Sequence, residues 1–260
     1  MSTPIASRLA MEIHDLTRAL TAASPAPRGL PYLGLDHASG TRLDVLASLS
    51  QRGVFRKYGL VLALGADLGA AARRLAARLG CEAVGTAASA ELARAAATLT
   101  RRTPQHAHVR SVAAAPAVLP FGTARFTHVW IVESLAQVAD APATIVDVRR
   151  VLRPGGFLAV QDLSAVAGAA VADLHVVDPA ARAALLGEAG FVEIETRDVT
   201  ADAIEQAPAV LAARARLLAT LRRQATVDPA ALAWAETREA VGRALATGAL
   251  RVTQLVARRP

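Results

Sequence analysis

Short apolar segments alternate with stretches of helical periodicity along most of this chain, and this alternation constrains its fold more than any other feature. The segment Gly59-Leu60-Val61-Leu62-Ala63-Leu64-Gly65 predicts a short buried strand. Further strands are predicted at 81–86, 108–113, 127–132, 157–162, 191–199 and 250–257. Helices are predicted at 5–22, 41–51, 70–79, 90–99, 141–152 and 179–189, with a long helical stretch at 203–246. This order predicts an α/β fold with a doubly wound, mostly parallel sheet.

The composition excludes several other classes of protein. Hydrophobic residues make up 53% and charged residues 20% of the 260 residues, which is typical of a globular chain rather than a disordered one. A single cysteine, Cys81, cannot form an intramolecular disulfide, so we expect a cytoplasmic protein. No apolar segment approaches the twenty residues of a membrane span, and Glu12 and Asp15 interrupt the place of a signal peptide. We therefore expect a soluble protein that is not exported and does not bind membranes.

The net charge of +7 raises the question of a nucleic-acid partner. The arginines are dispersed as pairs along helical stretches, and aromatic residues make up only 3% of the chain. Because single-stranded nucleic acids are held by basic and aromatic side chains together, we expect solvated arginines and no nucleic-acid partner. Every basic residue except Lys57 is an arginine, and with the abundance of alanine this indicates a GC-rich bacterial genome.

Two regions are predicted along the chain. Residues 1–40 would form an N-terminal helix and a linker, since helical spacing ends at the Pro- and Gly-containing segment 24–29. Residues 41–260 would form the α/β domain, with a helical insertion at about 203–246.

Several short strings resemble class I S-adenosylmethionine-dependent methyltransferases, of the small-molecule type that methylates ubiquinone and tocopherol precursors. The strings are 61–65 with Gly69, Leu119-Pro120-Phe121, Phe126-Thr127-His128-Val129-Trp130, Val151-Leu152-Arg153-Pro154-Gly155-Gly156, Glu188-Ala189-Gly190-Phe191 and Leu255-Val256-Ala257-Arg258-Arg259-Pro260. Over residues 30–260 the resemblance implies a Rossmann-like methyltransferase fold. It also implies that the N-terminal helix and linker fold over the site as a lid.

The chain departs from that family where the family binds its cofactor. The glycine-rich turn keeps Gly65 and Gly69, but Asp67 replaces its middle glycine. Alanine stands at three positions where the family commonly has an acidic residue: Ala63, Ala87 and Ala115. Ala87 is the position whose carboxylate would hold the ribose hydroxyls. Hydrogen bonds to charged groups contribute about 1.5 to 3 kcal/mol each, so two losses would weaken binding by about a hundredfold to ten-thousandfold. We therefore expect a vestigial cofactor site and no cofactor, with S-adenosylmethionine as the alternative.

Ligands of doubly wound sheets bind beyond the carboxyl ends of the strands, so the candidate residues follow those strands or belong to the lid. We predict catalytic roles for Tyr32, His37 and Gln161 as donors or shaping groups. The predicted substrate-binding residues are Met11, His14, Trp130, Glu133 and Asp162. Alternative roles remain open: Trp130 as a core residue, His37 as a solvated loop residue, and Glu133 and Asp162 as caps of the following turns.

Metal and covalent chemistry find little support. His106 and His108 share one face of a strand, but no third ligand is evident, so we expect no metal. The chain has no G-x-S-x-G segment and no convincing Ser-His-Asp or Cys-His set.

Three functions remain. The first is a methyltransferase-like enzyme that no longer uses S-adenosylmethionine and cyclises an apolar polyketide-type intermediate, for example by cycloaddition. Proteins of this fold recruited into bacterial polyketide pathways resemble that description, and an apolar cavity can promote such a reaction by orientation alone. The second is an O- or C-methyltransferase with His37 or Glu133 as general base. The third is a non-catalytic partner protein, and a homodimer remains open.

Overall fold

The computed structural model describes residues 5–22, 31–37, 41–42, 45–52, 59–66, 68–166, 174–223 and 229–260. Its strands are β1 (Leu60–Leu64), β2 (Glu82–Ala87), β3 (Val109–Ala113), β4 (Phe126–Val132), β5 (Leu152–Ala165), β6 (Val192–Asp198) and β7 (Leu250–Arg258). Its α-helices are α1 (Ile5–Leu20), α2 (Leu46–Arg52), α3 (Ala70–Leu79), α4 (Ala90–Arg101), α5 (Ala141–Val151), α6 (Pro179–Glu188), α7 (Thr200–Ala203), α8 (Pro208–Arg223) and α9 (Pro229–Ala246). Short 3₁₀ helices cover Pro104–Ala107 and Leu135–Gln137.

The strands form one twisted sheet in the order β3-β2-β1-β4-β5-β7-β6. β1 to β5 pair in parallel, while β7 is antiparallel to both β5 and β6. This confirms the predicted doubly wound, mostly parallel sheet. The strand order reverses between β1 and β4, and ligands of such sheets bind beyond the carboxyl ends of the strands at that point.

Alternating residues of the strands bury the two faces of the sheet. On β1, Val61 and Ala63 pack with α2 and α3, whereas Leu62 and Leu64 pack with α5 and α6. This alternation follows from the two-residue period of a strand. The runs are apolar throughout because helices cover both faces.

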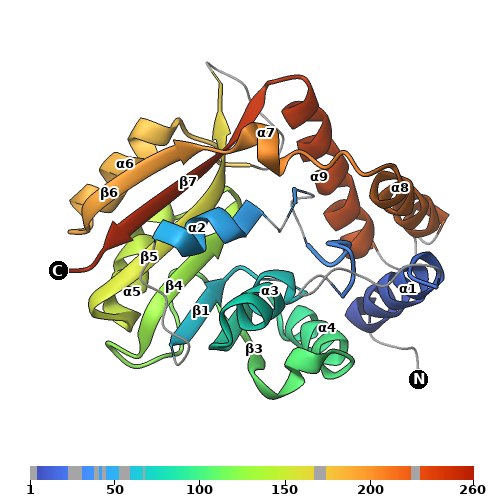
Figure 1. Ribbon diagram of the computed structural model, residues 1–260, viewed down its shortest axis with the longest axis horizontal. Coiled ribbons are helices and arrows are strands. Elements are labelled where there is room, and N and C mark those ends of the chain that lie inside the picture. Colours follow the sequence, from blue (N-terminus) through green and yellow to red (C-terminus); the bar gives the residue numbers. More distant parts are fainter. Residues whose placement is uncertain are drawn as a thin grey trace.

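The remaining helices form a separate group beside the sheet. α1 packs against α4, α8 and α9, and its residues Leu9 and Ile13 share a buried cluster with Leu99 and Leu217. Figure 1 shows α1, α8 and α9 together on one side, away from α5 and α6. Tyr32 and Leu35, in the segment after α1, belong to the same cluster. This segment therefore lies between the helical group and the sheet.

The predicted helix boundaries need two corrections. The helix expected at 41–51 begins only at Leu46. The helical stretch expected at 203–246 divides into α7, α8 and α9. Pro208 begins α8 and Pro229 begins α9, because proline lacks an N–H and disfavours helical geometry in the residue before it.

The strand predicted at 157–162 is too short, because the structure extends it through the preceding residues Arg153-Pro154-Gly155-Gly156. These residues belong to β5, which is longer at both ends than the predicted 157–162. Backbone hydrogen bonds join them to the end of the chain, from Gly155 N to Arg259 O (2.8 Å) and from Arg259 N to Gly156 O (2.9 Å). The linker predicted at 24–29 lies outside the described residues.

Candidate functional site

The carboxyl ends of β1, β4 and β5 bring a buried polar cluster together. In the sheet register Leu64 is opposite Ile131 and Val132 is opposite Gln161, so Gly65, Glu133 and Gln161 lie at one edge. The cluster, called the edge cluster below, consists of His37, Thr41, Ser48, Glu133, Gln161 and Gln254. It contains the predicted site residues His37, Glu133 and Gln161.

Glu133 is the centre of the edge cluster. Its side chain is buried, and Oε1 accepts hydrogen bonds from Thr41 Oγ1 and from Gln161 Nε2 (2.7 Å). His37 Nε2 lies 3.3 Å from Oε2. The backbone of Glu133 has a φ of 52°, a left-handed conformation that costs a residue with a side chain about 1 to 3 kcal/mol. The surrounding contacts therefore hold this carboxylate in place against local strain.

The side-chain amides of Gln161 and Gln254 form a series of hydrogen bonds that supports Glu133. Gln254 Nε2 donates to Gln161 Oε1 (2.8 Å), and Ser48 Oγ donates to Gln254 Oε1 (2.8 Å). Both glutamines are fully buried. The sequence prediction missed Thr41, Ser48 and Gln254. Gln254 carried a usable signal, because a glutamine inside the apolar strand 250–257 needs buried polar partners.

Asp162, predicted beside Gln161 in the site, lies on the opposite face of the sheet. Successive residues of a strand point to opposite faces, so these two side chains cannot converge on one ligand. Asp162 Oδ2 lies 3.1 Å from Arg182 Nη2 of α6, and both side chains are buried. Burial raises the pKa of the Asp162 carboxyl to about 6, against the opposing effect of Arg182. The geometry gives Asp162 a role in the packing of α6 rather than in the edge cluster.

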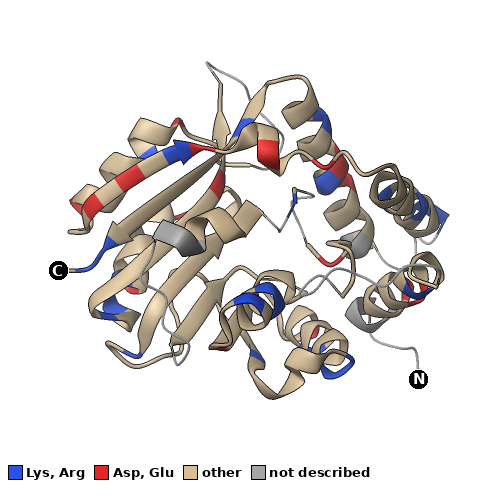
Figure 2. Ribbon diagram, viewed as in Figure 1, with Lys and Arg blue, Asp and Glu red and all other residues tan. Residues whose placement is uncertain are grey.

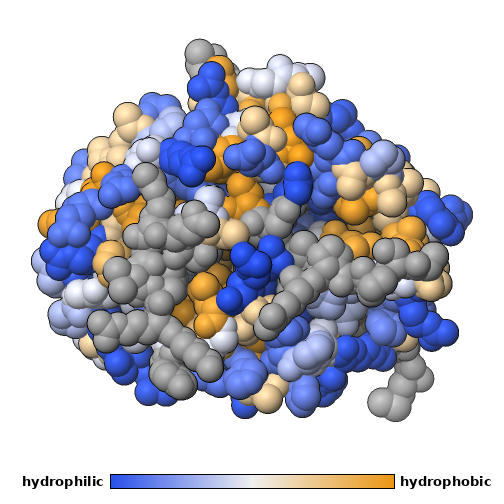
Figure 3. Space-filling view, viewed as in Figure 1, coloured by the Kyte–Doolittle hydropathy of each residue, from blue (hydrophilic) through white to orange (hydrophobic). Residues whose placement is uncertain are grey.

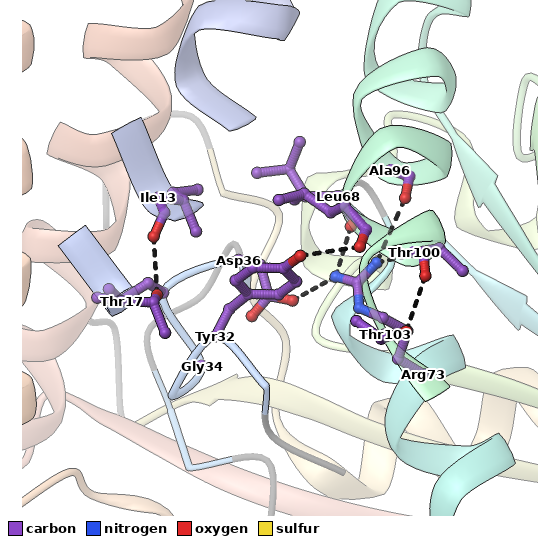
Figure 4. A network of polar contacts seen from close by, with 12 residues as sticks. Ile13, Thr17, Tyr32, Gly34, Asp36, Leu68, Arg73, Ala96, Thr100 and Thr103 are labelled. Carbon is purple, nitrogen blue, oxygen red and sulfur yellow. Dashed lines mark hydrogen bonds and ion pairs between the residues drawn. The ribbon is translucent and has the colours of Figure 1, made fainter. Parts of the chain in front are cut away.

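A second polar cluster surrounds the guanidinium of Arg73, which is fully buried beside the glycine-rich turn (Figure 4). This cluster, called the turn cluster below, consists of Tyr32, Asp36, Arg73 and Thr100. Arg73 forms an ion pair with Asp36 and donates to Thr100 Oγ1 (2.8 Å) and Leu68 O (2.7 Å). It thereby joins α3 and α4 to the segment after α1.

Tyr32 belongs to the turn cluster through its ring and its hydroxyl. The guanidinium carbon of Arg73 lies 5.4 Å from the centre of the ring, and His14 of α1 meets the ring edge-on. The hydroxyl donates to Leu99 O (2.8 Å), and burial raises the pKa of Tyr32. Because a tyrosine has one O–H, this hydroxyl cannot donate to a substrate in this conformation.

Two other predicted substrate contacts lie outside both clusters. Trp130 is fully buried on β4 and packs in the core with Ala63 and Ala159. Met11 lies on the exposed side of α1, where its sulfur is 3.4 Å from Arg102 Nη1.

The glycine-rich turn, where the family holds its cofactor, is in contact with side chains of this chain. Both glycines have positive φ, 66° for Gly65 and 87° for Gly69. A Cβ added at Gly65 would overlap the side chain of Ser134, and one added at Gly69 would lie 2.7 Å from Arg73 Nη1. The amide of Gly65 already donates to Thr86 Oγ1 (2.9 Å). The close approach that glycine permits is thus used for packing within the protein.

Three positions near this turn lack a side-chain acceptor that the family resemblance implies for S-adenosylmethionine. Ala87 is buried at the end of β2 and offers no side-chain acceptor for ribose hydroxyls. Ala63 is buried within β1, and Ala115 is exposed after β3. Asp67 lies outside the described residues. The cofactor's hydroxyl and amino groups would therefore lack these three acceptors.

A cavity of about 500 Å³ lies between α8 and α9, a region that the sequence analysis did not select. Its apolar wall includes Leu211, Leu217, Leu218 and Leu245, and Figure 3 shows apolar surface over this part of the molecule. Two arginines, the partly buried Arg214 and the buried Arg238, also line it. Both interrupt the apolar stripe of their helix, which is the signal that could have marked them.

The described residues contain no cluster of three His, Cys, Asp or Glu side chains with metal-binding geometry. Among the helices of the described segments, none has the length and apolar character needed to cross a membrane.

Comparison with known proteins gives the class of this fold. Residues 62–160 match the methyltransferase-domain family, and the matched region runs from within β1 to within β5. The chain is also 34% identical over 116 residues to methyltransferase GfsG of Streptomyces halstedii. That match spans 40% of this chain and only 42% of the relative. Residues 62–160 are thus similar to a methyltransferase domain, in agreement with the sequence resemblance.

Solved structures match over a longer part of the chain. The chain is similar to the [4+2]-cyclase SpnF, with a TM-score of 0.72 and 20% identity over 98% of this chain and 94% of that one. It is also similar to the geranyl diphosphate C-methyltransferase of Streptomyces coelicolor A3(2), with a TM-score of 0.63 and 16% identity over 96% and 98% of the two chains. At these identities the likeness shows the fold, which a cyclase and a methyltransferase share.

Proposed function

We propose that this protein is a methyltransferase-fold enzyme that cyclises an apolar polyketide-type intermediate without S-adenosylmethionine. The observation that carries the proposal is the turn cluster: Arg73, held by Asp36, contacts the glycine-rich turn, and Ala87 nearby offers no ribose acceptor. The likeness to a [4+2]-cyclase over nearly the whole of both chains supports the same proposal. We place the reaction in the cytoplasm of a bacterium, as a step of secondary metabolism.

The reaction we propose is an isomerisation. In a [4+2] cycloaddition, the three π bonds of a diene and an alkene become two new carbon–carbon σ bonds and one π bond, and no atom enters or leaves. The enzyme would then bind the flexible substrate in a folded conformation in which the diene and the alkene are close together. Binding in this conformation lowers the entropic part of the activation barrier. A donor placed at a conjugated carbonyl would add electrostatic stabilisation.

We assign that donor role to His37 of the edge cluster. Its Nε2 faces Glu133, which orients the ring, so Nδ1 is the ring nitrogen that would donate to the substrate. Gln161 and Glu133 act as positioning residues, because the amide of Gln161 bonds to both Glu133 and Gln254. We assign Tyr32 a role in shaping the site rather than in donation, because its hydroxyl donates its hydrogen bond to Leu99 O.

The test is a cyclisation assay with a linear polyene that carries a conjugated carbonyl. Loss of the polyene absorbance is followed with and without added S-adenosylmethionine, and the product mass is measured. We expect a product of unchanged mass at the same rate in both conditions, and a rate at least tenfold lower for His37→Gln. A product heavier by one methyl group, formed only with S-adenosylmethionine, would overturn the proposal.

The second candidate is methylation of a small molecule, and the His37–Glu133 contact is the observation that favours it. A histidine held by a carboxylate can take a proton from a hydroxyl or carbon nucleophile. This candidate predicts that His37→Gln slows a reaction that requires S-adenosylmethionine, whereas the cyclase proposal predicts that His37→Gln slows a reaction that proceeds with no methyl donor present.

A further inference from the structure

The cavity between α8 and α9 differs from the edge cluster in its wall and in its charge. Apolar side chains of both helices and Ile204 form most of its wall. Its volume of about 500 Å³ lies within the range of small-molecule sites, about 300 to 1,000 Å³. A cavity of this size and wall suits an elongated apolar ligand.

Arg238 gives the inner part of this cavity its polar character. Its side chain is only 6% exposed, and its two terminal nitrogens donate to Leu35 O (2.7 Å) and Gly34 O (3.0 Å). Its guanidinium carbon lies 4.6 Å from the ring centre of Trp234. Within the described segments, no carboxylate lies at ion-pair distance from Arg238, and its Nε has no hydrogen-bond partner.

Arginines at the rim of the cavity and Arg214 at its inner end lie near carboxylates, whereas Arg238 has no carboxylate at ion-pair distance within the described segments. At the rim Glu239 contacts Arg243 (2.9 Å) and Arg222 (3.5 Å), and Figure 2 shows such mixed charges along α9. At the inner end Arg214 lies 3.8 Å from Glu205, while Arg238 is bound to carbonyl groups alone. Burial lowers the pKa of Arg238; the charge of Arg214 adds to this effect, and the more distant carboxylate of Asp36, which is paired with Arg73, opposes it. A buried cation of this kind is stabilised by an anion.

We infer that this cavity binds an elongated apolar carboxylate, with its chain along the leucine-lined wall and its carboxylate at Arg238 and Arg214. The inference deepens the proposed function, on which it rests for the identity of this ligand as the substrate of cyclisation. The substrate would then be a polyene acid. Charge-assisted hydrogen bonds to two arginines would select it over a neutral molecule of the same length.

Calorimetric titration with decanoate and 1-decanol tests the ligand class, because the two probes differ in the charge of the head group. We expect decanoate to bind with a dissociation constant at least tenfold lower than that of 1-decanol. Arg214→Gln should remove most of this preference, whereas Arg243→Gln at the rim should leave it unchanged. Equal binding of the two probes, or no binding of decanoate, would overturn the inference.

A cavity-filling variant tests the location. Gly242 of α9 lines the cavity, and a Cβ added there meets no atom within 4 Å. Gly242→Phe should therefore fold, as thermal unfolding would verify, and weaken decanoate binding at least tenfold. The matched control is Gly122→Phe, at a glycine outside the cavity whose Cβ also has no neighbour within 4 Å. Unchanged binding in Gly242→Phe would place the ligand elsewhere and overturn the inference.

The same variant separates this inference from the proposed function. If the polyene cyclises equally fast in Gly242→Phe and in the unmodified protein, the cavity assignment fails and the cyclase proposal stands. If decanoate binds as expected but no polyene cyclises, the cavity assignment stands and the cyclase proposal fails.

Discussion

The edge cluster and the turn cluster both bind the segment that follows α1, yet they are built from different chemistry. In the edge cluster, one carboxylate is held by a hydroxyl, an amide and an imidazole at the carboxyl ends of β4 and β5. In the turn cluster, a buried ion pair between Arg73 and Asp36 lies against the glycine-rich turn. The edge cluster keeps titratable groups where ligands of this fold bind. The turn cluster places the side chain of Arg73 in contact with the glycine-rich turn.

The largest expected effect comes from breaking the ion pair of the turn cluster. Arg73→Met leaves the buried Asp36 without its cation, which should cost about 3 to 5 kcal/mol of the free energy of unfolding. Urea denaturation measures this loss. The double variant Arg73→Met with Asp36→Leu should recover at least half of it, and Arg222→Gln on the surface should change stability by less than about 0.5 kcal/mol. A loss below 1 kcal/mol in Arg73→Met would show that the pair does not hold this segment.

The next largest effect is a dependence of the free energy of unfolding on pH, which we expect from Asp162 and not from the edge cluster. The folded pKa of about 6 exceeds the unfolded value of about 3.9, so between these pH values the folded chain holds a proton that the unfolded chain has lost. Stability should therefore fall by about 3 kcal/mol as pH rises from 3 to 7. Urea denaturation across this range should show that Asp162→Asn removes this contribution. The same slope in the variant and the unmodified protein would assign the effect to another group.

A smaller loss is expected from the amides that support Glu133. Gln254→Leu leaves the buried Gln161 Oε1 without the donor that Gln254 supplies, which should cost about 1 to 3 kcal/mol. The double variant Gln161→Leu with Gln254→Leu, measured by the same denaturation, should be milder than the sum of the single variants. Strict additivity would contradict a shared network. Loss of cyclisation should accompany the single variant, since Glu133 loses its support.

The smallest effect concerns Tyr32. Tyr32→Phe removes the hydrogen bond to Leu99 O and should cost about 0.5 to 1.5 kcal/mol of stability, with the rate of cyclisation changed less than twofold. Stopped-flow absorbance of the polyene gives the rate. A tenfold slower reaction in a folded Tyr32→Phe protein would show that the Tyr32 hydroxyl takes part in the reaction. The reaction would then have to be placed near the turn cluster.

Sequence periodicity was enough for the sheet, because both of its faces are buried and its strands are short apolar runs. β1 to β4 lie within one or two residues of their predicted positions, and β6 and β7 do so as well. Periodicity did not predict the element boundaries that are set by a proline or by pairing with another strand. The division of 203–246 depends on Pro208 and Pro229, and the extension of β5 depends on its pairing with β7 along the whole of that strand.

Only part of the candidate site could be predicted from the sequence, namely side chains expected near the carboxyl ends of the strands. His37, Glu133 and Gln161 do meet, but Asp162 and Trp130 do not join them, because strand alternation places Asp162 on the other face and buries Trp130 in the core. The ion pair of Arg73 with Asp36 and the approach of Arg238 to Gly34 depend on tertiary packing between segments far apart in the chain. No local pattern encodes such contacts.

The central claim is that this fold works without S-adenosylmethionine, and calorimetric titration with S-adenosylhomocysteine and S-adenosylmethionine tests it most directly. The double variant Asp67→Gly with Ala87→Asp, which restores the turn glycine and the ribose carboxylate, serves as the gain-of-binding control. We predict no heat of binding to the unmodified protein up to millimolar concentration, and measurable binding to the variant. Micromolar binding to the unmodified protein would contradict the account and establish the cofactor site that the fold implies.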